Sequence, residues 1–138
     1  MMPGPSSERA VILAASERDA VWTAHLIKEA GYYANICGDL AELERQVASG
    51  AGLAIIADEA VRTADLAGLA RWLNAQPSWS DFPIVLMSEG GGPERSPEAA
   101  RLGRALGNVT FIERPFHPTT LVSLVAAAVR GRRSEEHT

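Results

Sequence analysis

Three polar side chains each come directly after a short apolar run of the sequence: Asp58, Ser88 and Arg114. A carboxylate can accept a phosphoryl group, a hydroxyl can donate a hydrogen bond to it, and a guanidinium can neutralise its charge. Taken singly, Asp58 and Ser88 would each be interpreted as turn residues. Because parallel strands end at one shared edge, where open α/β folds build their sites, the three residues together predict a single site.

The elements that must position these residues alternate between strand and helix. Continuous apolar runs predict strands over residues 10–14, 32–37, 53–57, 84–87 and 109–113. Helical spacing and capping residues predict helices over residues 18–30, 39–48, 64–75, 97–106 and 119–129. Such alternation predicts an α/β fold with a five-stranded, doubly wound parallel sheet of the flavodoxin-like order. We expect one domain over residues 9–132, with a flexible leader at 1–8 and a flexible tail at 133–138.

Composition excludes several classes of function. The net charge of −4 and a pI near 5.4 argue against a nucleic-acid surface, which needs clustered Lys and Arg. Cys37 is the single cysteine, so no disulfide framework is expected, and it is predicted to be a small buried hydrophobe. No segment reaches the roughly 18 apolar residues of a membrane span, and the first residues do not form a signal peptide. We therefore expect a cytoplasmic protein.

The arrangement of Asp58, Ser88 and the segment Arg114-Pro115-Phe116 resembles the receiver domain of two-component response regulators. The resemblance implies that Asp58 is the phosphoacceptor and that Ser88 and Arg114 bind the phosphoryl group. It also implies a cis bond before Pro115 and a switch role for Phe111, at the aromatic position that swings inward in receivers. Receivers have Lys where this chain has Arg114, which could pair through its planar fork with Asp58 or with a phosphate.

The metal-binding positions of the family differ in this chain. Receivers follow the first strand with two carboxylates that bind Mg²⁺, whereas the corresponding residues are Ala15 and Ser16. Mg²⁺ prefers oxygen ligands such as carboxylates, and neither position has a carboxylate. We therefore expect no tight binding of Mg²⁺ and no cofactor. Glu17 is one position out of place and is predicted to point away. Glu89, directly after Ser88, is expected to repel a phosphate or else to act as a replacement ligand.

Three functions follow, none of them an enzyme except the last. The first is a single-domain response regulator that accepts a phosphoryl group on Asp58 from a histidine kinase or phosphotransfer protein. The second is a pseudo-receiver, in which Arg114 pairs permanently with Asp58 and the domain acts only by binding other proteins. The third is a flavodoxin-like enzyme or nucleotide binder, which residues 15–18 disfavour because they hold no glycine for a phosphate loop. The apolar last helix, residues 119–129, further predicts a homodimer through its free face.

Overall fold

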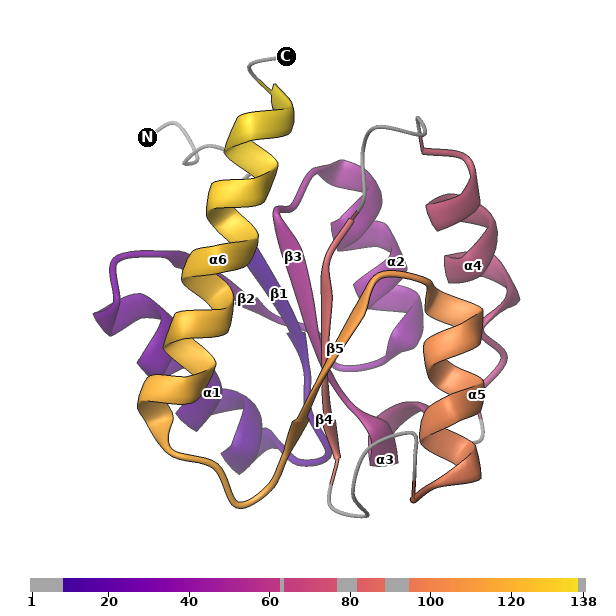
Figure 1. Cartoon of the computed structure of the whole chain (residues 1–138), viewed down its shortest axis with the longest axis horizontal. Coiled ribbons are helices and arrows are strands. Elements are labelled where there is room, and N and C mark those ends of the chain that lie inside the picture. The colour runs from indigo at the N-terminus through magenta and orange to yellow at the C-terminus, as the bar shows by residue number, and fades with distance from the viewer. Residues whose placement is uncertain (1–8, 63, 77–81, 89–94, 137–138) are drawn as a thin grey trace.

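Five parallel strands form one sheet in the order β2-β1-β3-β4-β5 (Figure 1). The structure, a computed structural model, describes residues 9–62, 64–76, 82–88 and 95–136. The strands are β1 Arg9–Leu13, β2 Tyr33–Ile36, β3 Leu53–Ala57, β4 Ile84–Ser88 and β5 Val109–Glu113. The predicted α/β class and the doubly wound parallel sheet of flavodoxin-like order are confirmed.

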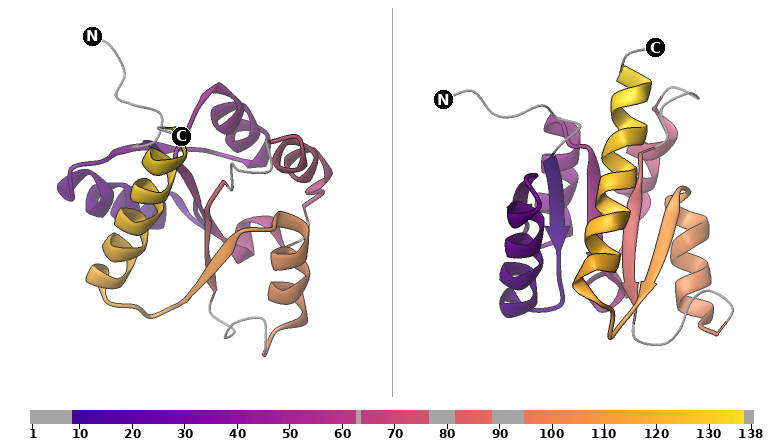
Figure 2. Two further views of the ribbon diagram at one scale, coloured as in Figure 1. Left: turned by 45° about the horizontal axis from the view of Figure 1, so that its top comes forward. Right: turned by 60° about the vertical axis from the view of Figure 1, so that its left-hand side comes forward.

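Helices cover both faces of this sheet. They are α1 Glu17–Glu29, α2 Leu40–Ser49, α3 Asp58–Val61, α4 Ala67–Asn74, α5 Pro97–Leu106 and α6 Pro118–Glu136. Figures 1 and 2 show α1 and α6 side by side on one face and α2, α4 and α5 on the other. The short helix α3 lies at the carboxyl edge of the sheet, directly after β3. Among the described residues, no helix is both long and apolar enough to cross a membrane.

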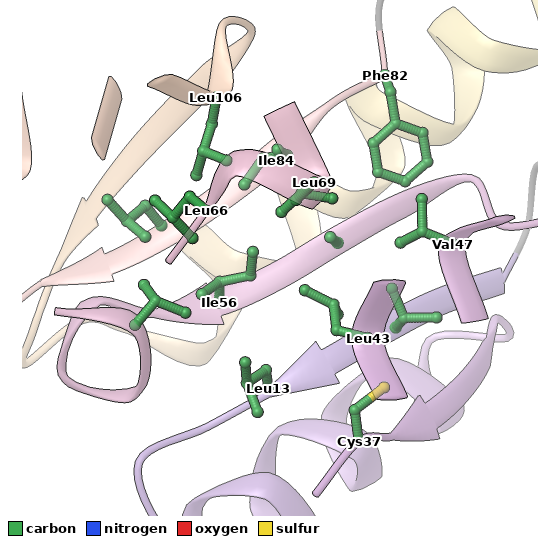
Figure 3. Packing of buried hydrophobic residues seen from close by; sticks show 14 of the residues in the cluster. Leu13, Cys37, Leu43, Val47, Ile56, Leu66, Leu69, Phe82, Ile84 and Leu106 are labelled. Atoms are coloured by element: carbon green, nitrogen blue, oxygen red, sulfur yellow. The ribbon is translucent and has the colours of Figure 1, made fainter. Parts of the chain in front are cut away.

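The core consists of two apolar layers, one on each face of the sheet. All five residues of β3 and of β4 are buried, which explains why their sequences, apart from Ser88 at the end of β4, are continuous apolar runs without alternation. Figure 3 shows the layer beneath α2, α4 and α5, where Leu43, Ile56 and Leu69 pack together. Cys37 belongs to this layer, and its predicted burial is confirmed; burial raises the pKa of its thiol to about 11.

The helix ends follow from local chemistry that the sequence displays. Ser16, Asp39 and Ser96 each accept a hydrogen bond from a backbone N–H in the first turn of the helix that follows. Gly31 lies in the turn after α1 and has a φ of 96°, a left-handed conformation that favours glycine.

Three elements differ from the expectation. The four-residue helix α3 was not predicted, and the predicted helix over residues 64–75 is the shorter α4. Helix α6 continues from Pro118 to Glu136, past the expected end at residue 129 and into the segment expected to be a tail. The leader 1–8 and Glu89 lie outside the described residues.

Candidate functional site

The register of the sheet brings the three polar residues to one edge. Ala57 of β3 is paired with Met87 of β4, so the residues that follow, Asp58 and Ser88, are neighbours. The backbone N–H of Arg114 donates to the carbonyl oxygen of Ser88 at 2.8 Å, which holds the end of β5 against the end of β4. Asp58, Ser88 and Arg114 therefore meet at the carboxyl edge of adjacent strands, as the sequence predicted.

Asp58 is a buried carboxyl group with a perturbed ionisation. Only 6% of the residue is exposed, and burial is the main reason that its pKa rises from 3.8 to about 6. A hydrogen bond with the Glu59 side chain and the Glu59 charge raise this pKa further. A hydrogen bond from Ser88 and the charge of Arg62 lower it. At about pH 6, Asp58 is therefore half protonated, and the charges of Glu59 and Arg62 shift this balance in opposite directions.

Glu59 is an ion-pair partner of Arg114, whereas the sequence analysis considered Asp58 or a phosphate for this role, with Asp58 as the permanent partner in the pseudo-receiver alternative. Nη2 of Arg114 donates to both carboxylate oxygens of Glu59, and both side chains are largely shielded from solvent. Burial by itself would raise the pKa of Glu59, but hydrogen bonds from Asp58 and Arg114 lower it to about 2. The physical reason is that α3 places Glu59, the residue after Asp58, within hydrogen-bond distance of the Arg114 guanidinium after β5.

A second arginine approaches Asp58 from its own helical segment. Arg62 follows Asp58 by four residues, and its Nη2 lies 3.8 Å from Oδ1 of Asp58. Its Nε forms an ion pair with Oε2 of Glu98 at the start of α5, at 2.9 Å. Nη2 of Arg101, also on α5, donates to the backbone carbonyl of Arg62 at 2.9 Å. Arg62 thus links the Asp58 site with α5.

The other expected site residues take the following places. The bond between Arg114 and Pro115 is cis, as predicted. Phe111 is half-buried against the core layer, and its ring edge meets α5 at Gly103, where an added Cβ would lie 3.0 Å from Cζ. The inward movement expected of Phe111 stays a prediction.

The residues at the acidic-pair positions do not fit a magnesium ion. Ala15 offers no side-chain donor, and the Ser16 hydroxyl accepts the Asp19 N–H as the cap of α1. Glu17 is exposed on the first turn of α1. The described residues contain no group of three His, Cys, Asp or Glu side chains that could hold a metal ion. With Glu59 bonded to Arg114, the described side chains around Asp58 do not make a donor set suited to Mg²⁺.

A pocket of about 490 Å³ opens on the side of Arg114 that faces α1. Its walls are mainly apolar and include Trp22, Met87 and Phe116, with the Asp19 side chain at the first turn of α1. Trp22 is 46% exposed, and its ring lies 6.0 Å from that of Phe116, measured between centroids. The sequence analysis did not single out this pocket, which needs the fold to bring α1 next to the segment after β5.

Comparison with solved structures places this architecture among known ones. The chain superposes on the chemotaxis response regulator CheY4 of Vibrio cholerae with a TM-score of 0.68 at 18% identity, covering 87% of this chain and 97% of that one. The chain also superposes on the receiver domain of a histidine kinase from Syntrophus aciditrophicus, with a TM-score of 0.70 at 23% identity, covering 90% of this chain and 91% of that one. The chain folds as a receiver-like domain.

A third receiver-like neighbour is the receiver domain of a putative Luxo repressor protein from Vibrio parahaemolyticus, with a TM-score of 0.71 at 17% identity, covering 94% of this chain and 95% of that one. No protein-family model matches the sequence, and no curated protein is detectably similar to it. The receiver-like fold is therefore established from the structure, at identities that leave each site residue to be argued from its own geometry.

Sequence reasoning missed Glu59 and Arg62, which pair with Arg114 and Asp58 respectively. The pair of Asp58 and Arg62 has the spacing of four residues at which opposite charges meet on a helix. That signal was available but needed α3 to be recognised as helical. The bond between Glu59 and Arg114 joins positions 55 residues apart, so only the assembled sheet reveals it.

Proposed function

We propose that this chain is a receiver-type signalling module of a two-component phosphorelay, with Asp58 as the phosphoacceptor. The observation that carries the proposal is the meeting of Asp58, Ser88 and Arg114 at one sheet edge. Ser88 hydrogen-bonds Asp58, and Arg114 is anchored to Ser88 through the backbone. A histidine kinase or phosphotransfer protein would supply the phosphoryl group, and the module itself would act by binding and not by catalytic turnover.

The pair of Glu59 and Arg114 defines the resting state in this proposal. A phosphoryl group on Asp58 adds negative charge next to Glu59, which weakens the hold of Glu59 on Arg114. Arg114 can then turn to the phosphoryl oxygens, for which its planar fork is suited. Since Arg114 begins the segment that leads into α6, and Phe111 packs against α5, phosphorylation would act on the surface formed by α5, β5 and α6.

The test is the intact-protein mass after incubation with acetyl phosphate. Wild type is expected to gain the mass of one phosphate, and the Asp58→Ala variant none. Asp65→Ala, which removes a carboxylate at the start of α4, is the control and should still be modified. Equal modification of wild type and Asp58→Ala would show that the acceptor is elsewhere, and no modification of either would contradict the proposal.

A second candidate is a pseudo-receiver that signals without phosphorylation. The observation that favours it is the bond between Glu59 and Arg114, which already gives the arginine an acidic partner next to Asp58. In that function, Asp58→Asn would leave partner binding unchanged, whereas Glu59→Gln would weaken it. A phosphorelay module shows the reverse dependence, since its output requires Asp58.

The predicted homodimer through the last helix is part of this proposal. Leu121, Val125 and Val129 face the sheet and are buried, and the remaining apolar residues of α6 from Val122 to Ala128 are half-buried or small. Light scattering over a range of concentrations tests this association, and a monomer mass at the highest concentration would contradict it.

A further inference from the structure

Arg62 is placed to reach any group that is attached to Asp58. Its Nη2 lies 3.8 Å from Oδ1 of Asp58, which is longer than a hydrogen bond. That Oδ1 atom is buried and accepts no hydrogen bond from the described residues. The guanidinium therefore attracts the carboxylate without a hydrogen bond to it, and its Nη2 lies 3.8 Å from the oxygen that lacks a donor.

The backbone of Arg62 is fixed by a hydrogen bond, whereas its side chain is held only by a solvated ion pair. The backbone carbonyl accepts a hydrogen bond from Arg101, which fastens the end of α3 to α5. The side chain is 48% exposed, and its partner Glu98 is 55% exposed, so the ion pair between them is solvated and weak. A stronger negative charge at Asp58 can compete with Glu98 for the guanidinium.

The charges around Asp58 show what an added phosphoryl group would require. Glu59 and Asp58 are acidic, Arg114 is bonded to Glu59, and Ala15 and Ser16 provide no carboxylate for a cation. A phosphoryl group brings further negative charge, which in phosphoryl transfer is neutralised by metal ions or arginine side chains. Within the described residues, Arg62 is the cation that lies near Asp58 and is paired only with a solvated glutamate.

We propose that Arg62 neutralises the phosphoryl group on Asp58, so that this site accepts phosphate without a metal ion. The inference rests on the proposed function, because it takes Asp58 as the acceptor. In the reaction with acetyl phosphate, an ionised Asp58 oxygen forms a bond to phosphorus. The bond from phosphorus to the acetyl oxygen breaks, and acetate leaves with the electron pair, so no proton or co-reactant is needed.

The experiment compares initial rates of phosphate incorporation from acetyl phosphate, in EDTA and in Mg²⁺, by intact mass. Wild type is expected to react at similar rates in both. Arg62→Gln should react slower by at least about tenfold, in line with the loss of one charge-stabilising donor. Arg62→Lys keeps the charge and should recover most of the rate, which packing alone would not explain. Arg71→Gln, an exposed arginine of α4, is the control and should equal wild type.

A variant with the opposite expected effect strengthens the test. Glu98→Gln removes the competing partner of Arg62 and should increase the rate by about two- to fivefold, the range that a solvated ion pair allows. If circular dichroism shows that Arg62→Gln does not fold, Glu98→Gln alone tests the inference. A rate of phosphate incorporation in Glu98→Gln equal to that of wild type then overturns it.

The outcomes separate this inference from the function on which it rests. Phosphorylation of wild-type Asp58 that is abolished by EDTA, or Arg62→Gln reacting like wild type, overturns the role of Arg62 and leaves the phosphoacceptor intact. Absence of any Asp58-dependent mass gain, with or without Mg²⁺, overturns both.

Discussion

Asparagine at position 58 is expected to stabilise the folded protein above about pH 6. Folding raises the pKa of Asp58 from its ordinary value of 3.8 to about 6, chiefly by burial, so the folded state disfavours the ionised carboxylate. Wild type therefore loses stability as the pH rises through about 6. Asparagine is neutral at every pH, is close in shape to protonated aspartic acid, and can still donate to Glu59.

The expected gain in stability of Asp58→Asn follows from the rise in the pKa of Asp58 on folding. A rise of about two pKa units corresponds to about 3 kcal/mol at a pH where Asp58 is ionised in both states. Asp58→Asn should therefore raise the free energy of unfolding by about 2–3 kcal/mol at about pH 8, and by about half of that at about pH 5. Below about pH 4 the difference should nearly vanish. The lowered pKa of Glu59 acts in the opposite direction but is common to both proteins, and largely cancels in the comparison.

Urea unfolding followed by tryptophan fluorescence at these three pH values measures the difference. Glu17→Gln, which neutralises an exposed carboxyl on α1, is the control and should change stability by less than about 0.5 kcal/mol at each pH. A difference between Asp58→Asn and wild type that does not depend on pH would refute the assignment of a buried, hard-to-ionise carboxyl. A less stable variant at about pH 8 would refute it as well.

Three further predictions concern the same site and the core beneath it. The rate of phosphorylation of wild type by acetyl phosphate should rise with pH, with a midpoint near 6, because only ionised Asp58 attacks phosphorus; a rate independent of pH would contradict this. Glu59→Gln should move that midpoint to lower pH, because the hydrogen bond and charge of Glu59 both raise the pKa of Asp58; an unchanged or higher midpoint would argue against the coupling. Leu121→Ala should reduce the free energy of unfolding by about 2–5 kcal/mol in urea titrations, because Leu121 is fully buried, whereas Ser123→Ala on the exposed side of α6 should have little effect.

The sheet could be predicted from the sequence because its central strands are buried on both faces. Such strands need unbroken apolar runs, and β3 and β4 begin where the runs begin. The closeness of Asp58 to Ser88 could be predicted as well, since Asp58 directly follows β3 and Ser88 ends the adjacent parallel strand β4. The strands and the closeness of Asp58 to Ser88 could be predicted because they depend on the apolar pattern along the chain and on the alternation of strands and helices.

The ion pairs of the site could not be predicted in the same way. A helix of four residues, as α3 is, is too short to show periodicity, so the turn that directs Glu59 toward Arg114 left no pattern. Arg114 was expected to pair with Asp58 or with a phosphate, and Glu59, one residue further along, was not considered as its partner. Which carboxylate wins depends on side-chain direction at the edge of the sheet, a tertiary property.

The close approach of Phe111 to Gly103 has a consequence for how the sequence can change. Glycine inside a helix costs about 0.5–1 kcal/mol relative to alanine, yet an alanine Cβ at position 103 would meet the edge of the Phe111 ring at 3.0 Å. The side chains at positions 103 and 111 therefore compete for the same space, so a larger side chain at one position requires a smaller one at the other. Homologous chains with a larger residue at position 103 are expected to carry a smaller one at position 111, so that the two positions covary although they lie on different elements.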